Sequence, residues 1–381
     1  MKKIYWRPSK VPRAALLVSA ILAIAALSSV ELIKIKRKQP YFEEKFQASL
    51  TMKKGMEAIK AYRINHFGPI DMAADPANSG MIGLPQSLIT SVFGHLPAKH
   101  NTINPNWAAV MVEMMKKAGL KEGDVVAAGF SGSFPALNLA TLAAAEVLRL
   151  KVVAISSVAA STWGANIPEF TWLDMERLLQ KEGLTSHRSV GASYGGKEDM
   201  ALGRSKKGRE LLRAAMERNG LSPLDFETTK ENIDERMAIY QKFAGDRQIA
   251  AYVNVGGGTV SVGTVLGKRL FRPGLNMKIP PGTMDVDGVI IRFAREGVPV
   301  IHMVYIDQLV ERYGLTPTPL VMPSVGEGQI YRRVEYNLYL AAANLVILLL
   351  VLYAFLKLDI GYRIFGSSRT TQPPKHPEPM V

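Results

Sequence analysis

Two long apolar segments near the ends of the chain constrain its fold more than any other feature. Residues 14–33 and 337–357 are almost wholly apolar. Each is about as long as the twenty or so helical residues that cross the hydrocarbon core of a bilayer. Lys and Arg flank both segments, which favours membrane spans over buried core helices. The sequence therefore predicts one N-terminal and one C-terminal transmembrane helix around the central part of the chain.

The basic residues beside these segments predict the orientation. Arg332 and Arg333 precede the second segment, and four basic residues follow its apolar run, which ends at Leu356: Lys357, Arg363, Arg369 and Lys375. Positive charge concentrates on the cytoplasmic side, and two spans place both termini on one side. We therefore expect a cell (inner) membrane protein with a cytoplasmic basic tail (1–13), a cytoplasmic disordered tail (358–381) and an extracytoplasmic centre.

The first segment leaves one alternative open. Residues 23–25 (AIA) loosely fit a signal-peptide cleavage site, so the segment could be removed after export. The basic cluster at residues 34–38 follows directly and favours a retained anchor.

The charge and composition exclude several classes of protein. Most of the net charge of +14 lies beside the two apolar segments, so the central part is close to neutral, and we expect no nucleic-acid partner. The chain has no cysteine, which excludes thiolate metal sites, iron–sulfur clusters and cysteine nucleophiles. The histidines show no metal-ligand spacing, and we expect neither a metal nor a cofactor.

The central part divides into two regions. Residues 34–120 read as a helix, either a stalk or a packed element, followed by an irregular Gly- and Pro-rich lead-in. In residues 121–325, five short apolar runs alternate with helical segments; the runs lie at 124–130, 151–158, 188–193, 249–255 and 298–305. This alternation predicts an α/β fold with a mostly parallel, Rossmann-like sheet flanked by helices.

Small polar residues and glycines follow the predicted strands. Because ligands of open α/β sheets bind at the carboxyl ends of the strands, these residues are candidates for a ligand site. Glycine allows close backbone approach, and free amides hold anions. Short loops also need Gly and Ser for turns alone, which is the plainer interpretation. The candidates are Ser131, Gly132, Ser133, Ser156, Ser157, Asn166, Asn254, Gly256, Gly257, Gly258 and Thr259.

The segment Gly129–Ser133 (GFSGS) is similar to the G-x-S-x-G nucleophile elbow and follows a predicted strand. Ser131 is therefore the candidate catalytic nucleophile. A triad would need an acid and a histidine further along, and Asp285, Asp287 and His302 occur in that order. Nothing else singles them out, and the same serines equally suit a helix cap or an anion cradle.

A Walker ATP site is not expected. The glycine run 256–258 looks like a phosphate or carboxylate loop, but a P-loop needs G-x-x-x-x-G-K-[ST]. Residues 263–268 (GTVLGK) have too short a spacing, and Arg269 stands where Ser or Thr is needed.

Five long motifs resemble a known family. They are the opening YWRPSKVPR and the segments Gly123–Asn138, Ile155–Leu179, Arg188–Gly203 and Val253–Gly263. In these motifs the chain resembles the poly-γ-glutamate system protein family, a membrane-anchored component of bacterial poly-γ-glutamate capsule biosynthesis.

The resemblance implies an accessory role rather than catalysis by an ATPase or ligase. The expected partners are the membrane, the poly-γ-glutamate synthetase with its polytopic membrane partner, and the polyanionic polymer itself. Arg188, Lys197 and Arg204 near the third predicted loop could serve binding of a polyanion. The alternative is an extracytoplasmic serine hydrolase or transferase that acts on the polymer through Ser131. The family supplies no catalytic residues to carry over, so whether the chain is an enzyme stays open here.

Overall fold

The computed structural model describes residues 13–357 apart from residues 225, 264 and 284. The chain divides into two units, Lys38–Arg333 and a unit formed by Met1–Arg37 with Val334–Val381. The expected cytoplasmic tails lie outside the described residues, except for Arg13.

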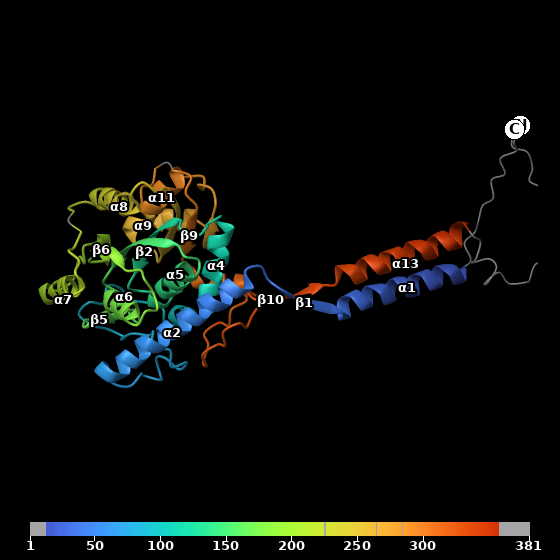
Figure 1. Cartoon of the computed structure of the whole chain (residues 1–381), viewed down its shortest axis with the longest axis horizontal. Coiled ribbons are helices and arrows are strands. Elements are labelled where there is room, and N and C mark those ends of the chain that lie inside the picture. The colour runs from blue at the N-terminus through green and yellow to red at the C-terminus, as the bar shows by residue number, and fades with distance from the viewer. Residues whose placement is uncertain (1–12, 225, 264, 284, 358–381) are drawn as a thin grey trace, which may run out of the picture. The chain divides into compact units, whose positions relative to one another are not determined.

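A six-stranded sheet forms the centre of the Lys38–Arg333 unit (Figure 1). Its strand order is β6-β3-β2-β7-β9-β8, and all neighbours pair in parallel except β8, which is antiparallel to β9. The strands are β2 (Val125–Ser131), β3 (Lys151–Ser157), β6 (Ser189–Ser193), β7 (Ile249–Val255), β8 (Gly274–Asn276) and β9 (Val300–Met303). The predicted α/β fold with a mostly parallel sheet is confirmed, and the five predicted strands are β2, β3, β6, β7 and β9.

Helices cover both faces of this sheet (Figure 1). One face packs against α2 (Phe42–Phe67), α4 (Trp107–Lys117), α5 (Pro135–Val147) and α12 (Ile306–Tyr313). The other packs against α8 (Thr229–Ala244) and α11 (Val289–Arg295). A third, smaller cluster joins α6 (Trp172–Lys181) and α7 (Lys206–Glu217). The remaining short elements are α3 (Leu96–His100), β4 (Asn166–Ile167), β5 (Phe170–Thr171), η1 (Lys197–Asp199), α9 (Thr259–Val262) and α10 (Val265–Leu270).

The central strand β2 shows why the sequence folds this way. Successive side chains of a strand point to opposite faces. Val126 and Ala128 lie in the core cluster with α5, while Val125 and Ala127 lie in the cluster with α8. Because both faces are covered, β2 is apolar along nearly its whole length rather than alternating with polar residues.

The helix expected as a stalk or packed element is a packed element. Ala48, Met52, Met56 and Ile59 of α2 are buried in the main core cluster. At Gly55 an added Cβ would lie 2.9 Å from Leu139 Cδ1, so glycine allows α2 to cross α5 closely. The predicted lead-in therefore belongs to the same compact unit as the sheet.

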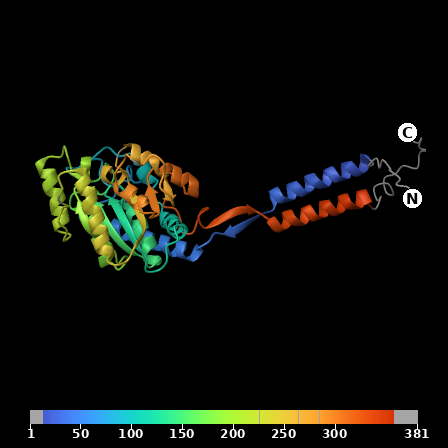
Figure 2. The ribbon, with the colours of Figure 1, turned by 90° about the horizontal axis from the view of Figure 1, so that it is seen from above.

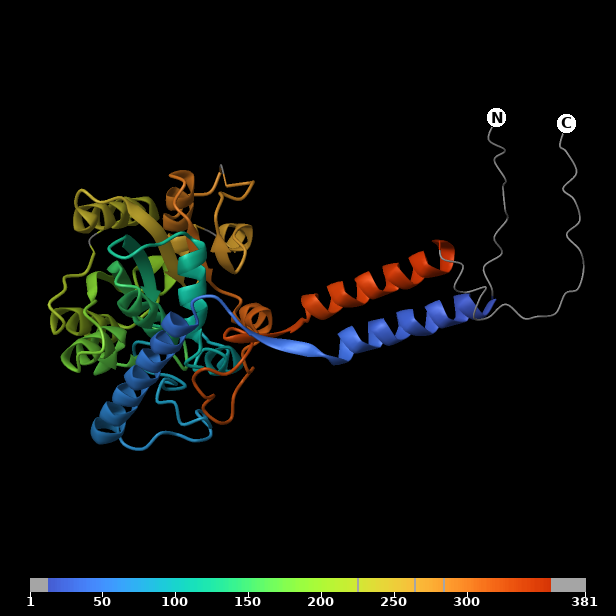
Figure 3. The same cartoon turned by 45° about the vertical axis from the view of Figure 1, so that its right-hand side comes forward.

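The second unit contains two apolar helices, α1 (Arg13–Leu32) and α13 (Leu338–Lys357), which lie side by side (Figures 2 and 3). Strands β1 (Lys34–Lys38) and β10 (Arg332–Tyr336) pair beside them. Asn344 Nδ2 on α13 donates to Ser29 Oγ at 2.8 Å and to Ala26 O at 3.2 Å on α1. The two apolar helices are thus joined by hydrogen bonds as well as by packing.

Among the described residues, one helix is long and apolar enough to cross a membrane, at Leu338–Phe355. The apolar stretch of α1 is shorter, at Leu16–Leu32. The structure therefore supports the second of the two expected spans by length and composition, and the first remains a prediction.

Candidate functional site

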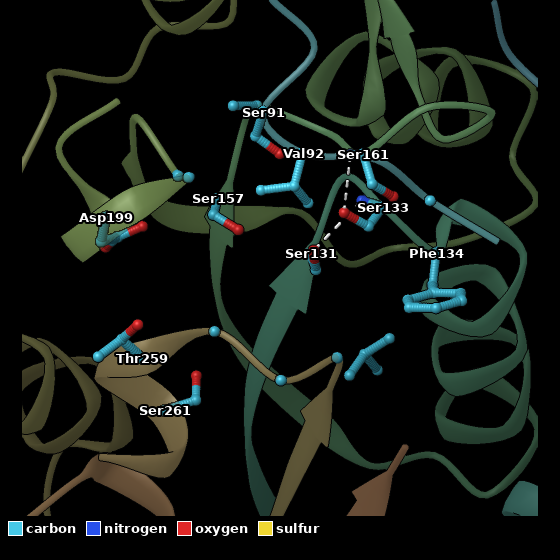
Figure 4. Close-up of a pocket in the computed structure, with 18 of the residues that line it drawn as sticks. Ser91, Val92, Ser131, Ser133, Phe134, Ser157, Ser161, Asp199, Thr259 and Ser261 are labelled. Atoms are coloured by element: carbon cyan, nitrogen blue, oxygen red, sulfur yellow. Dashed lines mark hydrogen bonds between the residues drawn. The ribbon is translucent and has the colours of Figure 1, made fainter. Parts of the chain in front are cut away.

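A cavity of about 650 Å³ opens where β2, β3 and β7 end (Figure 4). It lies at the edge of the sheet where the sequence predicts a ligand site. Seven of the predicted residues line it: Ser131, Ser133, Ser157, Gly256, Gly257, Gly258 and Thr259. The strand register explains the grouping, because Ser131 pairs with Ser157, and Ser157 pairs with Ser193.

Two predicted site residues, Ser156 and Asn254, point away from the cavity. Each lies one position before a cavity-lining residue at the end of its strand, so its side chain faces the opposite way. Ser156 Oγ is 2.7 Å from Ser189 Oγ, and Asn254 Nδ2 donates to Gly256 O at 2.6 Å. Both side chains are buried: Ser156 links β3 to β6, and Asn254 holds the start of the glycine loop.

Gly132 and Asn166 also serve the framework. Gly132 N donates to Ser157 O at 3.0 Å, and an added Cβ would lie 2.9 Å from Val158 O. Asn166 Oδ1 accepts from Leu84 N at 2.8 Å, while its Nδ2 donates to Leu84 O at 2.8 Å. Asn166 thereby fixes part of the predicted lead-in against the sheet.

The glycine loop Gly256–Gly258 offers backbone amides to the cavity. Gly256 has φ +94°, and an added Cβ would lie 3.2 Å from Ser131 Cβ, so only glycine fits here without strain. A Cβ on Gly257 would lie 3.0 Å from Lys268 Cε. Within the described part of the chain, no hydrogen bond uses the amides of Gly257 and Gly258. Free amides beside a lysine ammonium group form a favourable place for an anion.

Charged side chains around the cavity give it surplus positive charge. Asp199 lines the wall, but Arg236 pairs with it at 2.6 Å, and Ser193 Oγ donates to it at 2.8 Å. Burial opposes the charge on Arg236, yet the attraction of Asp199 prevails and raises the pKa of the guanidinium. Because this pair is neutral overall, Lys197 and Lys268 leave the cavity with net positive charge.

The segment that carries Lys197 and Asp199 has a strained backbone. Glu198, Asp199 and Ala201 have φ values of 53°, 63° and 52°, in the left-handed region that costs about 1–2 kcal/mol for a residue with a Cβ. Strain of this kind persists only where the surroundings hold it in place. Here the hydrogen bonds to the buried Asp199 carboxylate do so, and they hold Lys197 at the cavity wall.

The predicted lead-in supplies a wall that the sequence did not reveal. Ser91 N donates to Ala160 O at 2.7 Å, and Thr162 N donates to Val92 O at 3.0 Å. These bonds seat residues 91–95 along the loop that follows β3. Phe93 at this wall is 95% exposed, the highest exposure among the large apolar residues of the Lys38–Arg333 unit whose burial the structure describes.

Lys99 is a buried basic residue at the cavity that the sequence also did not reveal. It lies on α3, and the residue is 3% exposed. Its Nζ donates to Ser133 O and, at 2.8 Å, to Ser161 Oγ, and lies 4.0 Å from the centroid of the Phe134 ring. Burial lowers the pKa of Lys99 to about 7.

The triad considered for Ser131 is not assembled. Asp287 pairs with Arg292 at 2.6 Å, and His302 Nδ1 lies 2.9 Å from Asn254 Nδ2. Burial lowers the pKa of His302 to about 4, which keeps its ring neutral inside the sheet. Ser131 Oγ instead accepts a hydrogen bond from Ser133 N at 3.2 Å. No hydrogen bond among the described residues links Ser131 Oγ to Asp285, Asp287 or His302, so a role for them in activating Ser131 stays a prediction.

Comparison of the chain with models of known protein families finds no match, and comparison with curated proteins finds none. Among solved structures, the chain is similar to an archaeal alanine:glyoxylate aminotransferase at 12% sequence identity, with a TM-score of 0.18. The alignment covers 77% of this chain and 49% of the aminotransferase, so the chain spans about half the length of that protein. A likeness this low carries no argument about function.

Proposed function

We propose that this chain is a membrane-anchored accessory component of poly-γ-glutamate synthesis or export, and that its α/β unit binds glutamyl carboxylates of the polymer. The observation that carries the proposal is the cavity wall where the amides of Gly257 and Gly258, which have no hydrogen-bond partner among the described residues, lie beside the Lys268 side chain. A carboxylate accepts hydrogen bonds from amides and from an ammonium group at once.

The charge around the cavity supports a polyanionic ligand. Because Arg236 neutralises Asp199, the lysines leave the cavity positive. Most of the residues that line it, though not Lys268, lie within the motifs that resemble the poly-γ-glutamate system protein family, above all Gly123–Asn138 and Val253–Gly263. The proposed partners are the synthetase of that system and its polytopic membrane partner.

The proposed membrane arrangement has two spans, with both termini in the cytoplasm and the α/β unit outside the inner membrane. It draws support from the apolar stretch Leu338–Phe355, from the hydrogen bonds that Asn344 makes to α1, and from the basic residues around both helices. The chain has no cysteine, so single introduced cysteines report topology cleanly. Ser186→Cys should react with a membrane-impermeant maleimide in intact spheroplasts, and Ser368→Cys should react only after lysis; the reverse pattern would invert the proposed topology.

Calorimetric titration of the full chain in detergent with poly-γ-glutamate at low salt tests the binding proposal. Replacing Lys268 by Gln removes one charged hydrogen-bond donor, worth about 1.5–3 kcal/mol, so the Kd should rise at least about tenfold. Lys121→Gln removes an exposed lysine away from the cavity and should leave the Kd almost unchanged. Equal affinity of both variants, or no binding by the native chain, would contradict the proposal.

A further inference from the structure

A buried lysine–serine pair forms part of the cavity wall. Lys99 Nζ lies 2.8 Å from Ser161 Oγ, and both residues line the cavity. Ser161 is 5% exposed overall. Figure 4 shows Ser161 beside Ser133, with Thr259 and Ser261 across the cavity from them. The pair is therefore set apart from the wall proposed to hold a carboxylate.

Neighbouring groups fix the geometry of this pair. Ser161 N donates to Ser133 Oγ at 3.0 Å, which anchors the backbone of Ser161 to the start of α5. Lys99 Nζ also donates to Ser133 O and lies against the face of the Phe134 ring. These contacts come from three separate segments of the chain and hold the amine against the hydroxyl.

The spacing suits proton transfer from serine to lysine. A general base must lie about 2.6–3.2 Å from the group it deprotonates, and the observed distance is within that range. A lysine can act as this base when its neutral form is populated. Because burial lowers the pKa of Lys99 to about 7, a large fraction of the amine is neutral near pH 7. Ser131, by contrast, has no such base among the hydrogen bonds of the described residues.

We propose that Ser161 is a nucleophile and Lys99 its general base, and that the pair cleaves an amide bond in a chain that carries carboxylates. The choice of substrate class rests on the proposed function, since the glycine loop would hold the carboxylate. Ser161 Oγ attacks the carbonyl carbon and passes its proton to Lys99 Nζ. The C–N bond breaks, and that proton moves to the departing nitrogen. Water then attacks the ester, with its proton taken by Lys99, and releases the carboxylic acid and the free hydroxyl of Ser161.

Labelling with a fluorophosphonate tests this pair without any knowledge of the substrate. The probe loses fluoride when an activated serine attacks its phosphorus, and peptide mass spectrometry identifies the modified residue. The full chain in detergent should carry the label at Ser161. The labelling rate should rise about tenfold per pH unit below pH 7 and level off above it, as Lys99 loses its proton. The other titratable or charged side chains that line the cavity are His95, Lys197, Asp199, Arg236 and Lys268.

Two variants with matched controls sharpen the test. Lys99→Met should slow labelling at least about a hundredfold, the usual contribution of a general base, whereas Lys121→Met should not. Ser161→Ala should abolish the label, whereas Ser186→Ala, at an exposed serine away from the cavity, should retain it. Near-ultraviolet circular dichroism of each variant shows whether the fold persists.

The results separate this inference from the proposed function. Label on Ser131, no label on the native chain, or equal labelling of the native chain and a folded Lys99→Met variant would each overturn the lysine–serine pair. Polymer binding in calorimetry alongside such a result would leave the binding proposal standing. Labelling of Ser161 without polymer binding would support the pair and overturn the assigned substrate class.

Discussion

Replacing the buried Lys99 by Met should change how the stability of the α/β unit depends on pH. In the folded chain, burial lowers the pKa of Lys99 from 10.5 to about 7. Between these two values the unfolded chain binds a proton that the folded chain does not, so the free energy of unfolding rises with pH. The pH-dependent contribution of Lys99 to the free energy of unfolding is fully present above pH 10.5 and is lost as the pH falls to about 7. Met has a similar length and no proton to bind, so the variant should lack the dependence.

The structure sets the size of the effect. One proton taken up only by the unfolded chain changes stability by about 1.4 kcal/mol per pH unit. From about pH 7 to about pH 9, the free energy of unfolding of the native chain should therefore rise by about 2 kcal/mol relative to that of Lys99→Met. This value allows for Lys99 being half-protonated in the folded chain at about pH 7. The face of the Phe134 ring, 4.0 Å from Nζ, attracts the charged form and reduces this gain. Loss of the hydrogen bonds to Ser133 O and Ser161 Oγ lowers the stability of the variant at every pH but does not alter the slope.

Urea unfolding followed by tryptophan fluorescence measures the effect, because Trp107 and Trp172 are fully buried in this unit. The native chain, Lys99→Met and the exposed control Lys121→Met should be compared at several pH values. The control should follow the native chain. Parallel stability profiles of the native chain and Lys99→Met would show that Lys99 keeps an ordinary pKa, and would refute the reasoning.

Three further predictions concern separate parts of the molecule. Arg236→Met should destabilise the α/β unit by about 3–5 kcal/mol in urea unfolding, because it leaves the buried Asp199 unpaired. The control Arg213→Met, at an exposed arginine, should change the free energy of unfolding by less than about 0.5 kcal/mol. Equal effects of the two substitutions would contradict the role of the Arg236–Asp199 pair. Gly256→Ala and Gly297→Ala both force a positive φ on alanine, but only Gly256→Ala brings a Cβ within 3.2 Å of Ser131 Cβ. Only Gly256→Ala should therefore weaken polymer binding in calorimetry. An equal loss of binding in both variants would point to a general stability effect. Asn344→Leu removes the hydrogen bonds to α1, which are worth about 1 kcal/mol in a bilayer. The substitution should lower the yield of cross-linking between cysteines introduced on α1 and α13, whereas the control Leu345→Ala should not. Unchanged cross-linking in Asn344→Leu would show that packing alone pairs the helices.

The strands that build the cavity could be predicted because they carry a strong local signal. β2, β3 and β7 are short apolar runs bounded by Gly and Ser, and parallel pairing then brings their carboxyl ends to one edge. β8 has three residues and no periodic pattern, so its antiparallel place at the edge of the sheet had no signal in the sequence.

The cavity itself could be predicted only in part, for two physical reasons. Side chains alternate along a strand, and the sequence alone did not show that Ser157 rather than Ser156 would face the ligand side. Lys99 reaches Ser161 across 62 positions of sequence, and only the folded lead-in brings them together. A basic residue in an irregular segment gives no local indication of such a contact.

Diffraction from crystals of the full chain grown with a short γ-glutamyl oligomer tests the central claim most directly. The account predicts electron density for a carboxylate within hydrogen-bond distance of Gly257 N, Gly258 N and Lys268 Nζ. An oligomer bound elsewhere on the chain, or only water in the cavity at a saturating concentration of oligomer, would contradict it.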